Sequence, residues 1–161
     1  ANNIINSLLS KQRKFIVDLD LDYHTHPNVI AIFPKIPFYD KSFEVVMCFQ
    51  ILEHLPFNSF STYIDELIRV ANRYVILSLP DITLSRREKI KYFVYKNIKH
   101  PYEWRLYKPR KKHKEHFWEI GYYNINITNL INIFSKKNVL LLKHFRNKLN
   151  RYHHFFVLEI K

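Results

Sequence analysis

Residues 36–55 read IPFYDKSFEVVMCFQILEHL and carry the strongest fold signal in the chain. Within this stretch, Phe43–Phe49 is an almost uninterrupted apolar run in which Glu44 alone is charged. Runs of this kind are typical of a strand that is covered on both faces of a parallel sheet. The turn residues Pro37 and Asp40 precede the run, so the sequence predicts a strand over 43–49 with a turn before it.

Further strands and helices alternate along the chain on both sides of this strand. The other segments with strand patterns are residues 15–21, 29–33, 74–79, 139–145 and 154–160. The segments with helical periodicity are residues 3–10, 59–71, 84–97 and 127–134. A turn at 146–151 predicts that the last two strands form an antiparallel pair. The alternation predicts an α/β fold: a mostly parallel sheet flanked by helices, with a C-terminal antiparallel strand pair.

The composition fits one domain over residues 1–161, with a mass of 19.7 kDa. Hydrophobic residues make up 47% of the chain, which is enough to bury a core and excludes a wholly disordered protein. Its apolar runs are too short to cross a bilayer and no secretory pattern stands at the start, so we expect no transmembrane segment and a cytoplasmic location. The one cysteine, Cys48, excludes a disulfide framework and a cysteine-rich zinc site.

Positive charge is concentrated in a basic segment, residues 86–114. This segment has twelve basic and two acidic side chains, so it supplies ten of the twelve net positive charges of the chain. Tyrosine, phenylalanine and tryptophan residues are interleaved with the cations, a mixture that can bind phosphates and stack bases. The segment could hold an anionic substrate, nucleic acid or a membrane surface. Alternatively, it is a solvated basic insertion at about residues 84–114.

Candidate site residues follow the predicted strands. Ligands of a mostly parallel sheet bind beyond the carboxyl ends of its strands. Asp20 ends the strand predicted at 15–21 and could accept hydrogen bonds from both hydroxyls of a ribose, with Asp22 just beyond it. The alternative is an acidic turn that caps the next segment.

Histidines and acids form two further groups. Glu53 and His54 follow the strand at 43–49, where His54 could act as a general base or simply bond the backbone. The second group is His113, Glu115, His116 and Glu119. Its spacing is weak support for a metal site without cysteines, so we predict no metal. His153 and His154 open a predicted strand, and we expect them at the surface or in a turn.

Several phrases in this order resemble the class I S-adenosylmethionine-dependent methyltransferases. IPFYDKSFEVV at 36–46 is similar to the phrase that leads into the family's fourth strand, and QILEHL at 50–55 is similar to the phrase after it. The other similar phrases are ELIRV at 66–70, YVILSLP at 74–80, EHFWEIG at 115–121 and HHFFVL at 153–158. The resemblance covers essentially the whole chain and implies a Rossmann-like methyltransferase fold.

The resemblance also implies S-adenosylmethionine as the cofactor. It places the ribose-binding acid on Asp20, with Asp22 beside it, and the adenine pocket around Ile32 and Phe33. It places Phe49 and Gln50, at the end of the family's fourth strand, along the methionine and adenine end of the cofactor. The family has no universal catalytic residue, so we list His54, His116 and Glu119 as candidates for positioning or deprotonating the acceptor.

One departure from the family lies at the front of the chain. The family opens with a strand and a glycine-rich loop of the form E/D-x-G-x-G. The resemblance aligns Ala1–Asn3 with the end of that loop, but these residues include no glycine, and Gly121 is the chain's only one. The resemblance therefore implies a truncated methyltransferase that lacks the first strand, or a degenerate homologue. For an active enzyme we expect an anionic acceptor, such as a sugar phosphate, a nucleotide-linked or lipid-linked glycan, or RNA. The alternative is a non-catalytic nucleic-acid-binding or interaction protein.

Overall fold

The computed structural model describes residues 15–84, 86–97, 113–147 and 149–161. The chain forms two compact units, Ala1–Tyr39 and Asp40–Lys161, and each is described by itself. The helix predicted at 3–10 and most of the basic segment lie outside the described residues. Among the described residues, no helix combines the length and the apolar character needed to span a membrane.

The first unit holds a small parallel sheet. Strand β1, Leu19–Asp20, pairs with β2, Val29–Ile30, and the 3-10 helix η1, Tyr23–Thr25, lies between them. Both strands are much shorter than predicted. Before β1, the Asp18 and Asn28 side chains each accept the other residue's backbone N–H, at 3.2 and 3.0 Å, so side chains replace ladder bonds there.

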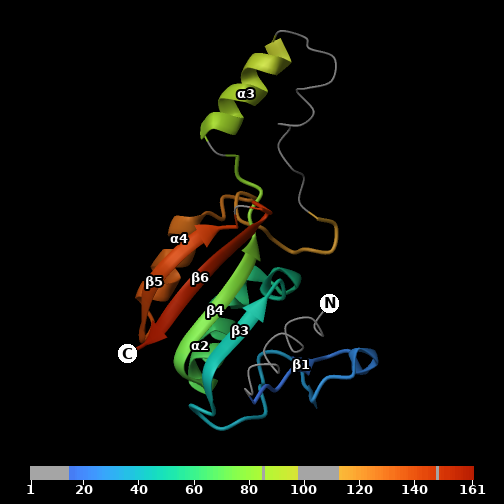
Figure 1. The fold of residues 1–161 in the computed structure, drawn as a ribbon, viewed down its shortest axis with the longest axis vertical. Coiled ribbons are helices and arrows are strands. Elements are labelled where there is room, and N and C mark those ends of the chain that lie inside the picture. The colour runs from blue at the N-terminus through green and yellow to red at the C-terminus, as the bar shows by residue number, and fades with distance from the viewer. Residues whose placement is uncertain (1–14, 85, 98–112, 148) are drawn as a thin grey trace. The chain divides into compact units, whose positions relative to one another are not determined.

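The second unit contains a four-stranded sheet (Figure 1). Its strands are β3 (Phe43–Phe49), β4 (Ala71–Pro80), β5 (Val139–Arg146) and β6 (His153–Ile160), in the spatial order β3-β4-β6-β5. β3 and β4 are parallel, whereas β6 is antiparallel to both β4 and β5. β6 therefore runs opposite to the other three strands. This arrangement confirms the predicted strand directions and the C-terminal antiparallel pair.

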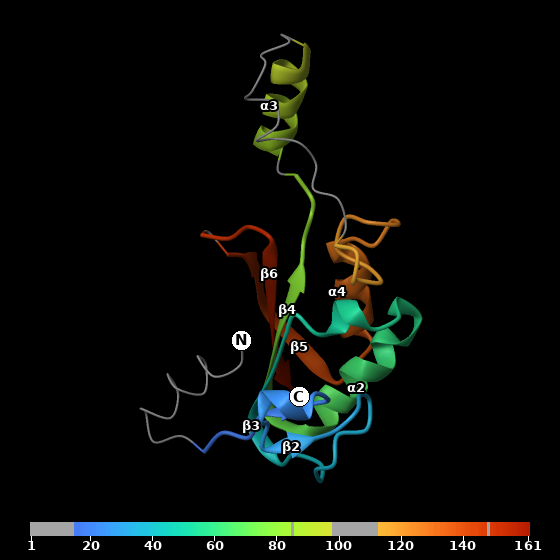
Figure 2. The same ribbon diagram turned by 90° about the vertical axis from the view of Figure 1, so that its right-hand side faces the viewer.

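Two amphipathic helices pack on one face of this sheet (Figure 2). They are α2 (Phe60–Val70) and α4 (Ile127–Ser135), both close to their predicted bounds. Asn126 and Asn129 form a reciprocal capping box at the start of α4, which satisfies two backbone N–H groups. On the opposite face, Val45 and Met47 of β3 are 40% and 39% exposed. The described residues thus cover one face of β3 better than the other, unlike the two-sided cover that the sequence predicted.

An aromatic core joins the helices to the sheet and to a later loop. Phe60 of α2 lies 5.3 Å from the Trp118 ring and 6.2 Å from Phe134 of α4, and Phe134 lies 5.5 Å from Phe156 of β6. All four side chains are at most 1% exposed. The Trp118 indole N–H donates to backbone carbonyls of residues 52 and 55, at 3.2 and 3.0 Å. This contact holds the segment around residue 118 against the chain that follows β3.

Gly121 sits where a side chain cannot fit. Its φ is +95°, and an added Cβ would lie 2.6 Å from the methyl carbon of Thr83. The neighbouring residue Ile120 forms a parallel bridge to Asp81, just beyond β4. The chain's only glycine therefore lets the 113–121 segment approach the end of β4 closely.

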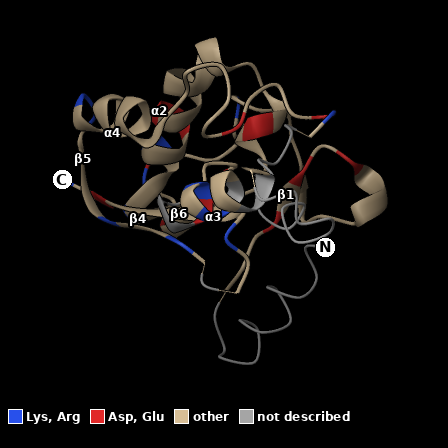
Figure 3. Ribbon diagram, turned by 90° about the horizontal axis from the view of Figure 1, so that it is seen from above, with Lys and Arg blue, Asp and Glu red and all other residues tan. Residues whose placement is uncertain are grey.

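A third helix, α3 (Arg86–Asn97), matches the helix predicted at 84–97. It contains the first basic residues of the basic segment (Figure 3). The loop predicted around Pro101 and Pro109 falls outside the described residues.

Candidate functional site

Gln50, just after β3, forms two hydrogen bonds with Ser78 near the end of β4. The Gln50 backbone N–H donates to the Ser78 carbonyl at 3.0 Å, and the Gln50 side-chain amide donates to the Ser78 hydroxyl at 3.1 Å. Gln50 has a φ of 54°, so the chain turns sharply as it leaves β3. Phe49 packs edge-on against Phe155 of β6, with centroids 5.9 Å apart. Phe49 and Gln50 thus lie at the carboxyl end of β3, the position that the resemblance implied.

The turn leads into the 3-10 helix η2, Leu52–His54, which buries an acidic side chain. Glu53 is 0% exposed, and neither of its carboxylate oxygens has a hydrogen-bond partner among the described residues. Burial raises the pKa of Glu53 to about 7. The nearby N–H of its own backbone lowers the pKa in part, and the negative charge of Glu119 raises it further. Burial, together with the Glu53 charge, also raises the pKa of the nearby Cys48 thiol to about 12.

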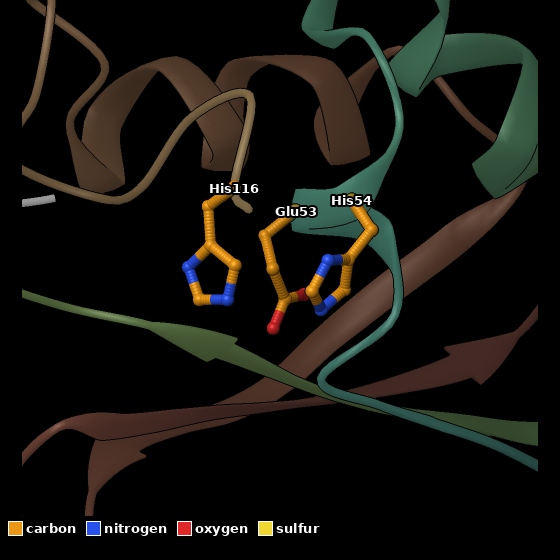
Figure 4. Close-up of side chains that lie close together, drawn as sticks. All are labelled: Glu53, His54 and His116. Atoms are coloured by element: carbon orange, nitrogen blue, oxygen red, sulfur yellow. The ribbon is translucent and has the colours of Figure 1, made fainter. Parts of the chain in front are cut away.

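Glu53 lies between two histidine side chains, His54 and His116 (Figure 4). One ligand atom from each of the three residues lies within 4.8 Å of the others. The imidazole rings of His54 and His116 are perpendicular, with centroids 4.7 Å apart. His54 is exposed, whereas Glu53 and His116 are buried, so the cluster opens to solvent on the His54 side.

A second buried carboxylate, Glu119, orients this cluster. Its Oε1 accepts hydrogen bonds from the His113 backbone N–H and the Tyr152 hydroxyl, both at 2.8 Å. The same oxygen lies 2.6 Å from His116 Nδ1. Because this oxygen already accepts from two other donors, we assign the third bond to an Nδ1–H of His116. Burial nevertheless lowers the pKa of His116, since it outweighs the attraction of Glu119 and is reinforced by His54 and His113.

Backbone contacts bring the two parts of the cluster together. The Phe117 N–H donates to the Glu53 carbonyl at 2.8 Å, beside the indole contacts of Trp118. His54 Nδ1 lies 3.3 Å from the Glu115 carbonyl oxygen. The predicted residues His54, His116 and Glu119 are therefore neighbours, although the chain separates the first from the others by about sixty residues.

A separate polar network lies beyond β4. The carboxylate of Asp81 is fully buried and contacts His154 Nδ1 at 2.9 Å and the Thr83 backbone N–H at 2.8 Å. Arg146 lies 3.5 Å from the same carboxylate. Burial alone would raise the pKa of Asp81, but the hydrogen bonds from His154 and Thr83 and the charge of Arg146 together lower it. His154 is 3% exposed, so the expectation of a surface residue was wrong. It faces inward because the side chains of β6 alternate between the two sides of the sheet.

The first unit holds the residues implied for the cofactor's nucleoside. Asp20 Oδ1 accepts the Asp22 N–H at 3.1 Å, and its Oδ2 accepts the Thr25 hydroxyl at 3.2 Å. Asp22 in turn caps η1 by accepting the backbone N–H two residues on, at 2.9 Å. Both acids therefore take part in a hydrogen-bonded turn, and the ribose role remains a prediction. After β2, Ile32 is 63% exposed and Phe33 is half-buried.

Sequence reasoning missed one residue beside Glu119 and one separate buried pair. The Tyr152 hydroxyl reaches Glu119 from the turn before β6, and no local pattern in the sequence marks it. The buried Asp81–His154 pair, which belongs to the network beyond β4, was also missed, because its two residues are 73 positions apart in the sequence. The burial of Glu53 was indicated in part by the apolar residues near it in the sequence, before and after it.

Comparison with known proteins shows a structural likeness. No protein-family model matches the chain, and no curated protein matches it. An S-adenosylmethionine-dependent methyltransferase from Archaeoglobus fulgidus is similar with a TM-score of 0.58 and 11% identity, over 96% of this chain and 80% of that one. The chain has the fold of the S-adenosylmethionine-dependent methyltransferases. This methyltransferase fold confirms the Rossmann-like α/β fold that the sequence predicted.

Two further structures extend the comparison. A protein from Pyrococcus horikoshii has a TM-score of 0.57 and 15% identity, over 98% of this chain and 78% of that one. A magnesium protoporphyrin IX methyltransferase from Synechocystis has a TM-score of 0.44 and 17% identity, and 73% of this chain is covered. The chain spans 45% of the length of that enzyme.

Proposed function

We propose that the protein is an S-adenosylmethionine-dependent methyltransferase. The observation that carries this proposal is the fold, because 96% of the chain aligns with a methyltransferase that depends on this cofactor. At 11% identity this likeness concerns the fold, and the activity is inferred from it together with the motif resemblance. We place the enzyme in the cytoplasm.

The proposed cofactor residues lie at or just after the ends of β1, β2 and β3. Asp20 ends β1, with Asp22 beyond it, and an ionised carboxylate has two acceptor oxygens that suit both hydroxyls of a ribose. The remaining proposed contacts follow β2 and β3 and are made by Ile32, Phe33, Phe49 and Gln50. The exposed Ile32 side chain can pack on the adenine ring but cannot accept its amino proton.

The reaction requires little chemistry from side chains. A lone pair of the acceptor would attack the methyl carbon of S-adenosylmethionine from the side opposite the sulfur. The bond from sulfur to that carbon would break at the same time, which would release S-adenosylhomocysteine and a proton from the acceptor. Holding the two reactants close and aligned supplies most of the acceleration in such a displacement. We assign His54, His116 and Glu119 to positioning the acceptor or taking up its proton. Of these, His54 is the exposed residue that an acceptor can reach directly.

An anionic acceptor is proposed from the charge distribution. The basic segment 86–114 carries ten of the twelve net positive charges, and α3 supplies the first of them. A small molecule with a phosphate, or a glycan linked to a nucleotide or lipid, fits this field.

The second candidate function rests on the same segment. Cations interleaved with aromatic rings also bind nucleic acid without catalysis. This alternative predicts that the affinity for a labelled oligonucleotide falls steeply as salt rises.

Calorimetric titration of S-adenosylmethionine into the purified chain tests the proposal. We expect saturable binding that weakens at least about tenfold in Asp20→Asn, because one neutral amide oxygen replaces a charged acceptor pair. Asp65→Asn, which removes an acid on α2 paired with Lys137, is the matched control and should bind as the wild type does. Absence of cofactor binding together with salt-sensitive oligonucleotide binding would favour the second candidate.

A further inference from the structure

Two histidines and one carboxylate converge in the cluster of Glu53, His54 and His116. Their ligand atoms lie within 4.8 Å of one another. Ligands at zinc bond lengths of about 2.0–2.2 Å stand roughly 3.4 Å apart in a tetrahedral site. Small side-chain rotations therefore suffice to close the cluster around one ion. The sequence did not reveal this arrangement, because His116 reaches the cluster only through the fold.

An independent observation at Glu53 points to a cationic ligand. The side chain is fully buried, and both oxygens lack a hydrogen-bond partner among the described residues. The ion pairs formed by described residues do not include Glu53 either. A buried carboxylate with neither a hydrogen-bond partner nor a counter-charge is costly, so the group is relieved either by holding a proton or by binding a cation. The oxygens lie next to the two imidazole rings, where a metal ion would provide that charge (Figure 4).

The surroundings prepare both histidines as ligands. With the Nδ1–H of His116 donating to Glu119, the Nε2 atom carries the lone pair. His54 Nδ1 faces the Glu115 carbonyl at 3.3 Å, an acceptor that likewise favours the hydrogen on Nδ1. Metal-binding histidines characteristically donate their other ring N–H to a carboxylate or a carbonyl in this way. Tyr152 and the His113 backbone N–H hold Glu119 in place from behind.

We infer that Glu53, His54 and His116 bind one divalent transition-metal ion, with Glu119 as the outer carboxylate that orients His116. Two imidazoles and one carboxylate suit zinc and its first-row neighbours, whereas magnesium and calcium prefer all-oxygen sites. Three protein ligands leave a further position, and exposed His54 puts it on the solvent side. That position would take water or an oxygen atom of an acceptor. Metal binding here does not depend on the proposed methyl transfer. With the ion bound, His54 and His116 would position the acceptor through the ion and would not take up its proton, because both nitrogens of each ring are engaged.

The test is a zinc titration of the full, untagged chain after chelator treatment and dialysis. We expect one equivalent of Zn²⁺ to bind by calorimetry, and Co²⁺ to give visible absorption bands in the same stoichiometry. Glu53→Gln and His54→Asn should each weaken zinc binding by more than about 100-fold, because each removes a ligand, and Glu119→Gln should weaken it by about 10–100-fold.

Matched controls separate this site from surface histidines. His26→Asn removes an exposed imidazole of the first unit at a φ of 51°, which asparagine tolerates, and should leave the zinc affinity unchanged. Because His54 is exposed, its substitution should preserve the circular dichroism spectrum and thermal midpoint of the metal-free chain.

Three outcomes would overturn the inference: no saturable zinc binding, zinc binding that survives both Glu53→Gln and His54→Asn, or an equal loss in His26→Asn. A parallel titration with S-adenosylmethionine reads the proposed function separately. Cofactor binding without zinc binding refutes the metal site alone, and zinc binding without cofactor binding refutes the methyltransferase proposal alone.

Discussion

Replacing Asp81 with asparagine should be among the most damaging isosteric changes in the second unit. The carboxylate is fully buried, accepts hydrogen bonds from Thr83 and His154, and lies 3.5 Å from Arg146. Asparagine keeps an oxygen for Thr83 but removes the charge and presents an amide to His154. Hydrogen bonds to charged groups contribute about 1.5–3 kcal/mol each, and breaking a buried ion pair costs about 3–5 kcal/mol. We expect Asp81→Asn to lower the free energy of unfolding by about 3 kcal/mol.

Urea unfolding followed by circular dichroism measures this loss. Asp65→Asn is the control, because Asp65 pairs with Lys137 at 2.6 Å but its side chain is 56% exposed. A surface pair of this kind contributes less than about 1 kcal/mol. If Asp81→Asn lost no more stability than Asp65→Asn, the argument that the buried charge stabilises the end of β4 would be refuted.

The same substitution has a pH signature. The folded chain holds the pKa of Asp81 below its ordinary value, so the folded state binds this proton less readily than the unfolded state does. The stabilisation is therefore complete above the unfolded pKa of about 3.9 and is lost as pH falls through the lower folded pKa. The difference in unfolding free energy between wild type and Asp81→Asn should be full at pH 7 and shrink below pH 4. A difference that stayed constant through this range would contradict the assignment.

Three further changes test other parts of the second unit. Gly121→Ala should cost about 2–3 kcal/mol in urea unfolding, because φ is +95° and the new Cβ would meet the Thr83 methyl carbon at 2.6 Å. Cys48 should resist alkylation at pH 8 in the folded chain and react on denaturation, because burial raises its pKa to about 12; rapid labelling of the native chain would speak against this. Trp118→Phe should cost about 2 kcal/mol, since it removes the indole donor to two backbone carbonyls and leaves a small cavity; a thermal melt unchanged from wild type would show that these contacts are unimportant.

Local patterns were enough to predict most of the second unit. The strand Phe43–Phe49 has the bounds that its apolar run indicated, and α2 differs from the predicted helix by one residue at each end. In both segments, side-chain periodicity and burial agree. The first unit was harder to predict, because Asp18 and Asn28 use side chains where backbone pairing was expected.

The candidate site could be predicted only in part. His54 and the pair His116 and Glu119 were singled out by residue type and position, but their meeting depends on how Trp118 and Gly121 seat the 113–121 segment against the rest. A sequence pattern reports neighbours along a helix or strand, whereas this cluster depends on contacts across more than sixty residues.

The placement of β6 has a consequence for how the sheet assembles. β6 follows β5 in the sequence, yet it lies between β4 and β5. During synthesis, β5 leaves the ribosome before the strand that joins it to the sheet exists, so this sheet cannot form in full until residues 153–160 have been made. A nonsense codon or proteolytic cut ahead of residue 153 would remove an interior strand and leave β5 without its neighbour in the sheet.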